Sequence, residues 1–289
     1  MDVTTLIGQS LINGLVLGTM YFLMAIGFTM VFGIMRVVNF AHGEFYMLGG
    51  FCVLYFFGNL HWPFLLALAA SACVVGLFGV LIERIVFRPF RNDELSGMIA
   101  ALGLAIVLQN TAALVFGAMP QSLPDVIAGS VTIGPVTVPA SRILVIGLSF
   151  AILVLLWLFI RFSRTGRAMR AVVQDGTAAA LQGMRPERIY PIAFGIGVGL
   201  AALAGGIMAP VLTVEPFMGV TPLLKAFVVV ILGGLGSVMG AVVAGLALGI
   251  FESFVSNFYG AAAADLLQFV LVIGILLVRP QGLLGEKEA

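Results

Sequence analysis

Long apolar runs separated by short polar breaks dominate the pattern of hydrophobic and polar positions in this chain. A helix that crosses the hydrocarbon core of a bilayer needs about 20 residues, and nine runs are candidates for such helices. They cover residues 6–34, 43–59, 63–83, 97–117, 141–160, 190–213, 222–235, 238–257 and 262–279. The pattern therefore predicts an all-α fold, a polytopic transmembrane helical bundle of about eight to ten spans.

Two of these runs leave the shape of the helix open. The first is consistent with one long tilted helix or with two pieces broken around Gly14 and Gly18. The seventh, 222–235, is short enough to be a half-helix. Since the candidate helices use most of the 289 residues, we expect a single transmembrane domain over 1–289 and no separate soluble domain.

The composition supports a protein that lies in a lipid bilayer. Hydrophobic residues make up 61% of the chain and charged residues 9%, which leaves no plausible aqueous globule. The start of the chain lacks the basic flank of a secretory signal peptide, so the first run is expected to be a retained span. The net charge of +1 gives no reason to expect a nucleic acid partner. Cys52 and Cys73 lie in apolar runs and are interpreted as small core residues.

Positive charges gather in a few of the breaks. Six of the fourteen lysine and arginine residues lie within 161–190, and cytoplasmic loops are enriched in these residues. Nine crossings with a periplasmic N-terminus and a cytoplasmic C-terminus place twelve of the fourteen on the cytoplasmic side. The outer loops then hold only Arg142 and Lys225, with Asp2, Asp125, Glu215 and Asp265.

The largest predicted outer segment is the periplasmic loop 118–140. Its β-branched stretch Ser130–Val138 is interrupted by Gly134-Pro135, which predicts a small hairpin. Such a hairpin is either a surface for an external partner or a connector.

Two polar, glycine-rich breaks resemble each other and are candidates for a transport path. One is Gly33–Glu44 and the other is Gly233–Gly240. Interrupted helices in matching positions of two halves often line such a path, whereas the alternative is a tight cytoplasmic turn at each place. The candidate path residues are Asn39, His42, Glu44, Gly233, Gly234, Gly236 and Ser237. Glu44 is also placed to cap the following helix, and Gly236 with Gly240 is expected to form one close-packing helix face.

The 161–190 loop carries its own helix signals. Thr165 is a candidate N-cap for a helix from Gly166 to Gln174, with Arg167 and Arg170 on one face. A second short helix, 177–183, is expected to end at Gly183 in the left-handed conformation. Pro186 suits the first turn of the next membrane helix.

The chain lacks residue patterns for nucleotide hydrolysis or other catalysis. Its two lysines, Lys225 and Lys287, do not end a phosphate-binding loop, and its two histidines are isolated. We therefore expect no enzyme activity and no cofactor in this chain. If ATP and Mg²⁺ drive its function, separate subunits must use them. Glu215, Lys225 and Glu252 lie in or near membrane segments, without a convincing pair of membrane acids for ion coupling.

Four motifs resemble those of the LivH-type permease of bacterial branched-chain amino-acid importers, in that family's order and over almost the whole chain. They are Asn39-Phe40-Ala41-His42-Gly43-Glu44, Glu83-Arg84 with Arg88-Pro89-Phe90-Arg91, Thr165-Gly166-Arg167-Ala168-Met169-Arg170-Ala171 and Leu232-Gly233-Gly234-Leu235-Gly236-Ser237. The stretch from Ala178 to Gly183 also resembles the coupling motif of ABC importer permeases. One departure is Thr177, where the general motif begins with Glu.

The resemblance implies an ABC importer permease in the bacterial inner membrane. Its partners would be a second paralogous permease, two cytoplasmic ATPase subunits and a periplasmic substrate-binding protein. The residues implied to couple to the ATPases are Thr165, Gly166, Arg167, Arg170, Ala178, Ala179 and Gly183. Because Thr177 replaces the usual carboxylate, the arginines and the short helix carry more of that expectation.

The implied substrates are branched-chain or other small neutral amino acids. One alternative is a permease for urea or short amides. Rivals from other classes are a self-sufficient secondary transporter or channel, which would need an ion site within its spans, and a structural membrane anchor.

Overall fold

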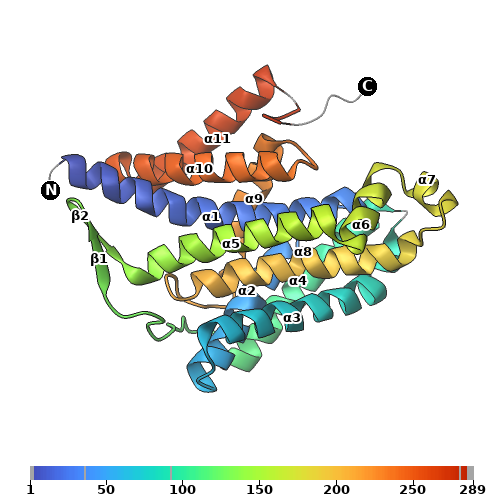
Figure 1. Cartoon of the computed structure of the whole chain (residues 1–289), viewed down its shortest axis with the longest axis horizontal. Coiled ribbons are helices and arrows are strands. Elements are labelled where there is room, and N and C mark those ends of the chain that lie inside the picture. The colour runs from blue at the N-terminus through green and yellow to red at the C-terminus, as the bar shows by residue number, and fades with distance from the viewer. Residues whose placement is uncertain (1–2, 36, 92, 280, 285–289) are drawn as a thin grey trace.

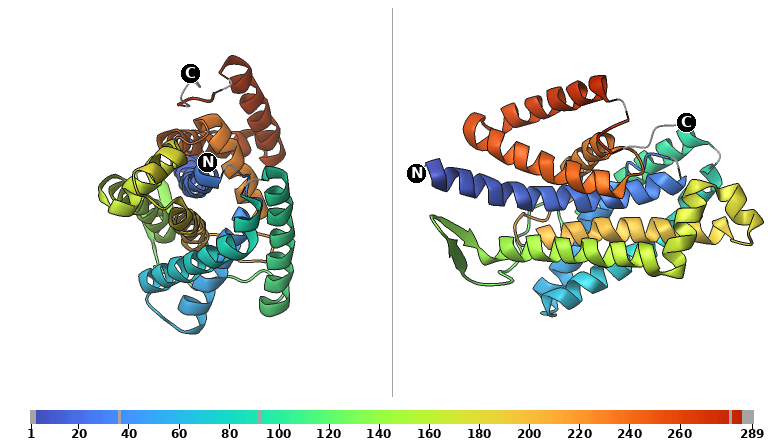
Figure 2. Two further views of the ribbon diagram at one scale, coloured as in Figure 1. Left: turned by 90° about the vertical axis from the view of Figure 1, so that its right-hand side faces the viewer. Right: turned by 45° about the horizontal axis from the view of Figure 1, so that its top comes forward.

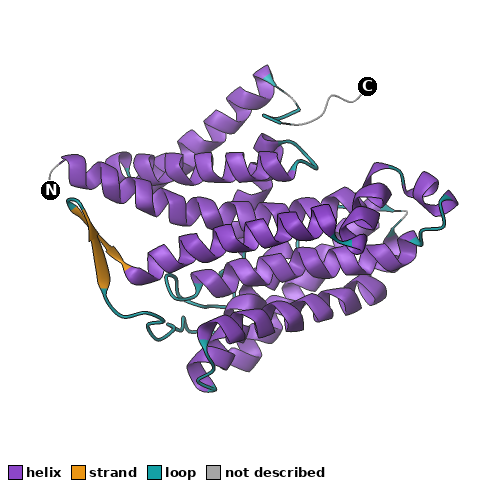
Figure 3. Cartoon of the chain, in the orientation of Figure 1, coloured by secondary structure: helices purple, strands orange, loops and turns teal. Residues whose placement is uncertain are grey.

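The computed structural model describes residues 3–35, 37–91, 93–279 and 281–284, which form a bundle of helices with one β-hairpin (Figures 1 and 3). The α-helices are α1 (Val3–Met35), α2 (His42–Val53), α3 (Phe64–Ile82), α4 (Glu94–Phe116), α5 (Ala140–Phe162), α6 (Arg164–Gln174), α7 (Gly176–Leu181), α8 (Pro186–Met208), α9 (Val220–Gly233), α10 (Val238–Tyr259) and α11 (Ala261–Val278). Two π-helical turns, Leu54–Asn59 and Glu83–Phe87, and a 3₁₀ turn, Arg88–Phe90, extend α2 and α3.

The predicted all-α transmembrane bundle is confirmed. Seven helices in the described residues are long and apolar enough to cross a membrane. Two further predicted spans are shorter: α2 continues into its π turn over 42–59, and α9 has 14 residues. At 1.5 Å per residue, α9 is about 20 Å long, less than the roughly 30 Å hydrocarbon core. The prediction of a half-helix there fits this length.

The first run is one unbroken helix, α1, which settles the alternative left open by its glycines. Gly14 and Gly18 face the backbone of α10: a Cβ atom on Gly14 would lie 2.6 Å from Ile250 Cα, and one on Gly249 would lie 2.5 Å from Gly18 Cα. The glycines therefore allow two backbones to approach rather than breaking the helix.

The two ends of the bundle differ in character. The start of α1 and the hairpin of β1 (Ser130–Ile133) and β2 (Val136–Pro139) lie at one end, the hairpin end (Figure 1). At the opposite end, the α6–α7 end, α6 lies beside the end of α5 and α7 projects farther out (Figures 1 and 2). The hairpin prediction is confirmed, with Val131 opposite Val138 and Gly134 at φ 60° in the turn. Cys52 is half-buried as expected, but Cys73 is exposed on α3, so its interpretation as a core residue is wrong.

The helices form two groups with the same order and opposite direction. In Figure 1, α1 and α3 run from the hairpin end toward the α6–α7 end, whereas α8 and α10 run back. Each group places a short helix, α2 or α9, between its first and second long helices, and ends with an outer helix, α4 or α11. This arrangement is the inverted repeat common among transporters, with α5, α6 and α7 as the connection.

Candidate functional site

The α6–α7 segment forms a compact amphipathic projection. Ser163, not Thr165, caps α6: its hydroxyl accepts a hydrogen bond from the Gly166 amide at 2.8 Å, so the Thr165 cap prediction is wrong. Ser163 is the residue with extended backbone, whereas Thr165 already lies in the first helical turn. Gly166 is buried against the end of α5, and a Cβ atom on it would lie 2.6 Å from Ile160 Cα. This close approach folds α6 back against the end of α5.

The two faces of α6 differ as the sequence predicts. Met169 and Val172 are buried against the bundle, whereas Arg167 and Arg170 are exposed. The apolar face fixes the helix to the membrane domain and leaves the two guanidinium groups at the surface, where Arg170 also donates to the Arg161 carbonyl oxygen at 3.5 Å.

The short helix α7 is built from backbone caps and small residues. The Asp175 carboxylate accepts hydrogen bonds of 2.9 Å from the amides of Thr177 and Ala178, and Gly183 ends the segment at φ 81° as predicted. Ala178 is exposed and Ala179 buried. Leu181 is 83% exposed at the tip, which gives the projection an apolar contact point. Pro186 occupies the first turn of α8, also as predicted.

A cavity of about 270 Å³ joins α6 to the membrane helices at this end. Its lining includes Thr29 and Gly33 from α1, Arg170 from α6 and Gly236 from the α9–α10 turn. The structure therefore brings the predicted coupling arginine and one predicted path glycine together. Movement of α6 would act directly on the end of α1 and on this turn.

The Gly33–Glu44 break reaches the interior of the bundle. Gly197, the middle residue of α8, faces Gly27 of α1, where an added Cβ would lie 2.5 Å from the Gly197 oxygen and 3.2 Å from His42 Nε2. Gly27 is about 12 Å from the end of α1 at Met35. α2 thus begins deep in the bundle, and the alternative of a tight turn at the cytoplasmic boundary is wrong for this break.

Its polar side chains are buried together. Asn39, His42 and Glu44 are each 2% exposed or less. Asn39 Oδ1 accepts from the Ala41 amide at 3.0 Å, and Gln109 of α4 donates to Glu44 at 2.7 Å. Neither ring nitrogen of His42 has a hydrogen bond of normal geometry, nor has the second Glu44 oxygen. No side-chain hydrogen bond caps α2, so the predicted capping role of Glu44 is supported only by its place in the first turn.

The second predicted break, Gly233–Gly240, is a turn at the α6–α7 end instead. Gly233 and Gly234 are buried, Ser237 caps α10 by accepting from the Gly240 amide at 3.0 Å, and Gly236 is exposed. Gly236 has φ 87° and no neighbour within 4 Å of an added Cβ, so the predicted Gly236/Gly240 packing face is wrong. Gly240 packs against Gly233.

The true counterpart of the Gly33–Glu44 break is the segment 209–219 between α8 and α9. Gly219, just before α9, lies against Gly43: a Cβ on Gly43 would be 2.9 Å from the Gly219 carbonyl carbon. The two short helices therefore begin side by side in the bundle interior. The prediction that Gly33–Glu44 and Gly233–Gly240 are matched breaks is wrong, because a similar hydropathy pattern does not tell how deep in the bundle each segment lies.

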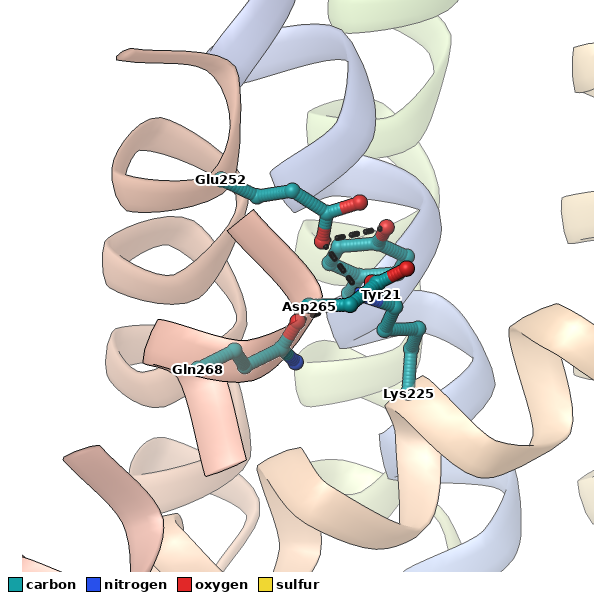
Figure 4. A network of polar contacts seen from close by, with 5 residues as sticks. All are labelled: Tyr21, Lys225, Glu252, Asp265 and Gln268. Atoms are coloured by element: carbon teal, nitrogen blue, oxygen red, sulfur yellow. Dashed lines mark hydrogen bonds and ion pairs between the residues drawn. The ribbon is translucent and has the colours of Figure 1, made fainter. Parts of the chain in front are cut away.

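A polar network within the membrane helices was missed from the sequence (Figure 4). Lys225 Nζ of α9 donates to Glu252 of α10 at 3.0 Å and to Asp265 of α11 at 2.7 Å, and it also contacts Gln268. Tyr21 of α1 donates to the same Glu252 oxygen at 2.9 Å. Lys225 is 8% exposed, so its assignment to an outer loop was wrong. The available signal was its position inside the apolar run 222–235.

The network ties α9, α10 and α11 of the second repeat to α1 of the first. A lone charge in lipid is costly and is accepted only when it is paired and hydrogen-bonded. The Glu44–Gln109 bond connects α2 to α4 in the same way that Lys225 connects α9 to α11. Among the described residues, no three His, Cys, Asp or Glu side chains gather in a possible metal site.

The chain is similar to known permeases over nearly its whole length. A family model described as the branched-chain amino acid transport system / permease component matches residues 10–276. The high-affinity branched-chain amino acid transport system permease protein LivH of Escherichia coli is 36% identical over 295 residues, covering 97% of this chain and 96% of that protein. BraD of Pseudomonas aeruginosa is 37% identical with the same coverage.

A second type of permease protein matches more distantly. LivM of Salmonella typhimurium is 28% identical over 296 residues, covering 91% of this chain and 67% of that protein. No solved structure matches the chain.

Proposed function

The chain belongs to the permease family of branched-chain amino acid transport systems, and we propose that it is one of two paralogous permease subunits of an ABC importer. It is a multi-pass membrane protein. Together with a LivM-like partner it forms the path for branched-chain or other small neutral amino acids. The similarity over 97% of the chain carries this proposal.

The α6–α7 projection supports docking to ATPase subunits. It presents Arg167, Arg170 and Leu181 outward, while its buried face contacts the ends of α1 and α5. Exposed cations steer and register a partner, and an exposed leucine at a projecting tip provides an apolar anchor. Closure of an ATPase dimer would push on α6 and thereby on the two short helices in the interior. The permease itself hydrolyses no nucleotide in this proposal, and ATP and Mg²⁺ are used by the partners.

The orientation follows from the charges. All described arginines except Arg142 lie in segments at the α6–α7 end or toward it, in 84–91, 161–188 and at 279, while the predicted cytoplasmic residues Arg36 and Lys287 lie outside the described residues. We place that end on the cytoplasmic side of a bacterial inner membrane. The hairpin end then faces the periplasm, where a substrate-binding protein would dock.

Uptake measurements test the proposal. The chain is co-expressed with its neighbouring permease, ATPase and binding-protein genes and reconstituted in vesicles. ATP-dependent accumulation of labelled leucine, isoleucine and valine is expected, with urea and acetamide as competitors. Strong competition by urea or acetamide would favour the alternative substrate class.

The Lys225 network favours testing one rival, a self-sufficient secondary transporter. Glu252 and Asp265 share one lysine, which supplies the pair of membrane acids that such a transporter needs. If this chain alone catalyses uptake that a protonophore abolishes and ATP does not support, the importer proposal is wrong.

A further inference from the structure

Arg142 stands apart from the other described arginines. It is the third residue of α5, at the hairpin end, and its guanidinium donates to the side-chain oxygen of Asn13 on α1. None of the ion pairs formed by the described residues includes it. A cation placed against the charge pattern of the rest of the protein, and without a carboxylate partner, is suited to receive an anion.

A cavity of about 280 Å³ lies beside this guanidinium. It is lined by Arg142 and Asn13 with apolar groups of Val16, Leu17 and Leu212, and by Glu252 of α10. The lining comes from α1 of the first repeat, from α5, and from α8, the α8–α9 connection and α10 of the second repeat. Its volume is just below the range of about 300–1,000 Å³ for sites of drug-sized ligands, which suits a smaller molecule.

Glu252 supplies the opposite charge. One of its carboxylate oxygens accepts from Tyr21 and Lys225, and Figure 4 shows the other oxygen free of these contacts. The cavity therefore combines a guanidinium group without a carboxylate partner, one oxygen of Glu252 that is free of these contacts, and an apolar wall.

We propose that this cavity, the Arg142 cavity, binds an α-amino acid with an aliphatic side chain. The Arg142 guanidinium receives the α-carboxylate, the free oxygen of Glu252 receives the α-ammonium group, and the aliphatic chain packs on Val16, Leu17 and Leu212. Guanidinium groups match carboxylates in two-point geometry. The proposal rests on the proposed import function and adds a substrate site within this subunit, separate from the place where α2 and α9 begin side by side.

The test measures protection of a cysteine in the cavity. In the assembled complex, Cys52 and Cys73 are replaced by Ser, and Ser256→Cys introduces a thiol on the cavity wall. Millimolar leucine should slow its reaction with a water-soluble thiol reagent severalfold. Leucinamide, which lacks the carboxylate, and 4-methylpentanoate, which lacks the ammonium group, should not. Asp125→Cys, exposed at the same end, is the control and should react equally with and without leucine.

Substitution of the charged groups completes the test. Arg142→Gln should raise the leucine concentration for half-protection at least tenfold, and Arg142→Lys should raise it less. The comparison of leucine with its two analogues needs only the intact Arg142 protein, so misfolding of a variant does not decide the result. Equal protection by all three compounds, or none by leucine while the complex accumulates leucine, would overturn the cavity proposal alone. Absence of any amino-acid uptake by the parent complex would refute both proposals.

Discussion

Replacing Gly27 by Ala is the sharpest perturbation of the packed interior. The added Cβ would lie 2.5 Å from the Gly197 oxygen and 3.2 Å from His42 Nε2. Real Cβ contacts below 3.0 Å are essentially never seen, so α1 and α8 would have to separate by about 0.5 Å or more in an interior packed like a crystal. The separation would occur where α2 begins.

Gly103→Ala in α4 is a matched control, because nothing lies within 4 Å of its added Cβ. Both changes share the gain of about 0.5–1 kcal/mol for Ala over Gly inside a helix. Their difference therefore isolates the overpacking cost at Gly27, about 1–3 kcal/mol. At about 2–4 °C per kcal/mol, Gly27→Ala should melt several degrees below Gly103→Ala.

The assay combines thermal unfolding of the purified complex with uptake normalised to assembled complex. Gly27→Ala is expected to lose most uptake even at temperatures where it remains folded, because α1 and α8 are displaced close to where the two short helices, α2 and α9, begin. Gly103→Ala should retain parent activity. Equal melting temperatures and equal uptake for the two variants would refute the close contact between α1 and α8 at Gly27.

Three further predictions follow from the topology and the charged groups. A reporter inserted at Asp125 should read as periplasmic and one at Asp175 as cytoplasmic; a cytoplasmic signal from the first would reverse the proposed orientation. Reversing the charge of Arg167 and Arg170 together should uncouple ATP hydrolysis from uptake without preventing membrane insertion, since rim charges register docking; normal uptake would leave them as topology signals only. Lys225→Met should lower the melting temperature of the complex, because Glu252 loses its ion-pair partner within the bundle; an unchanged melting temperature would show that the network contributes little.

Much of the fold could be predicted from local patterns. The helices α1, α3, α4 and α5 fall within a few residues of their apolar runs, because transfer of a segment into lipid depends chiefly on its own side chains. The hairpin followed from β-branched residues around Gly134, and the two faces of α6 followed from its helical period. The left-handed turn at Gly183 that follows α7 needed only the backbone freedom of glycine.

Only the tertiary structure decided which polar breaks are deep. Gly33–Glu44 and Gly233–Gly240 look alike in sequence, yet the first meets Gly27 and Gly219 in the interior and the second turns at one end. Likewise the sequence shows Lys225 as a charged residue within an apolar run, but it does not show its partners. These lie on α10 and α11, 27 and 40 residues farther along the chain. Hydropathy sums the transfer cost of one segment at a time, whereas depth and pairing depend on contacts between segments distant in the chain. The inverted repeat that creates these contacts exists only once the helices have packed.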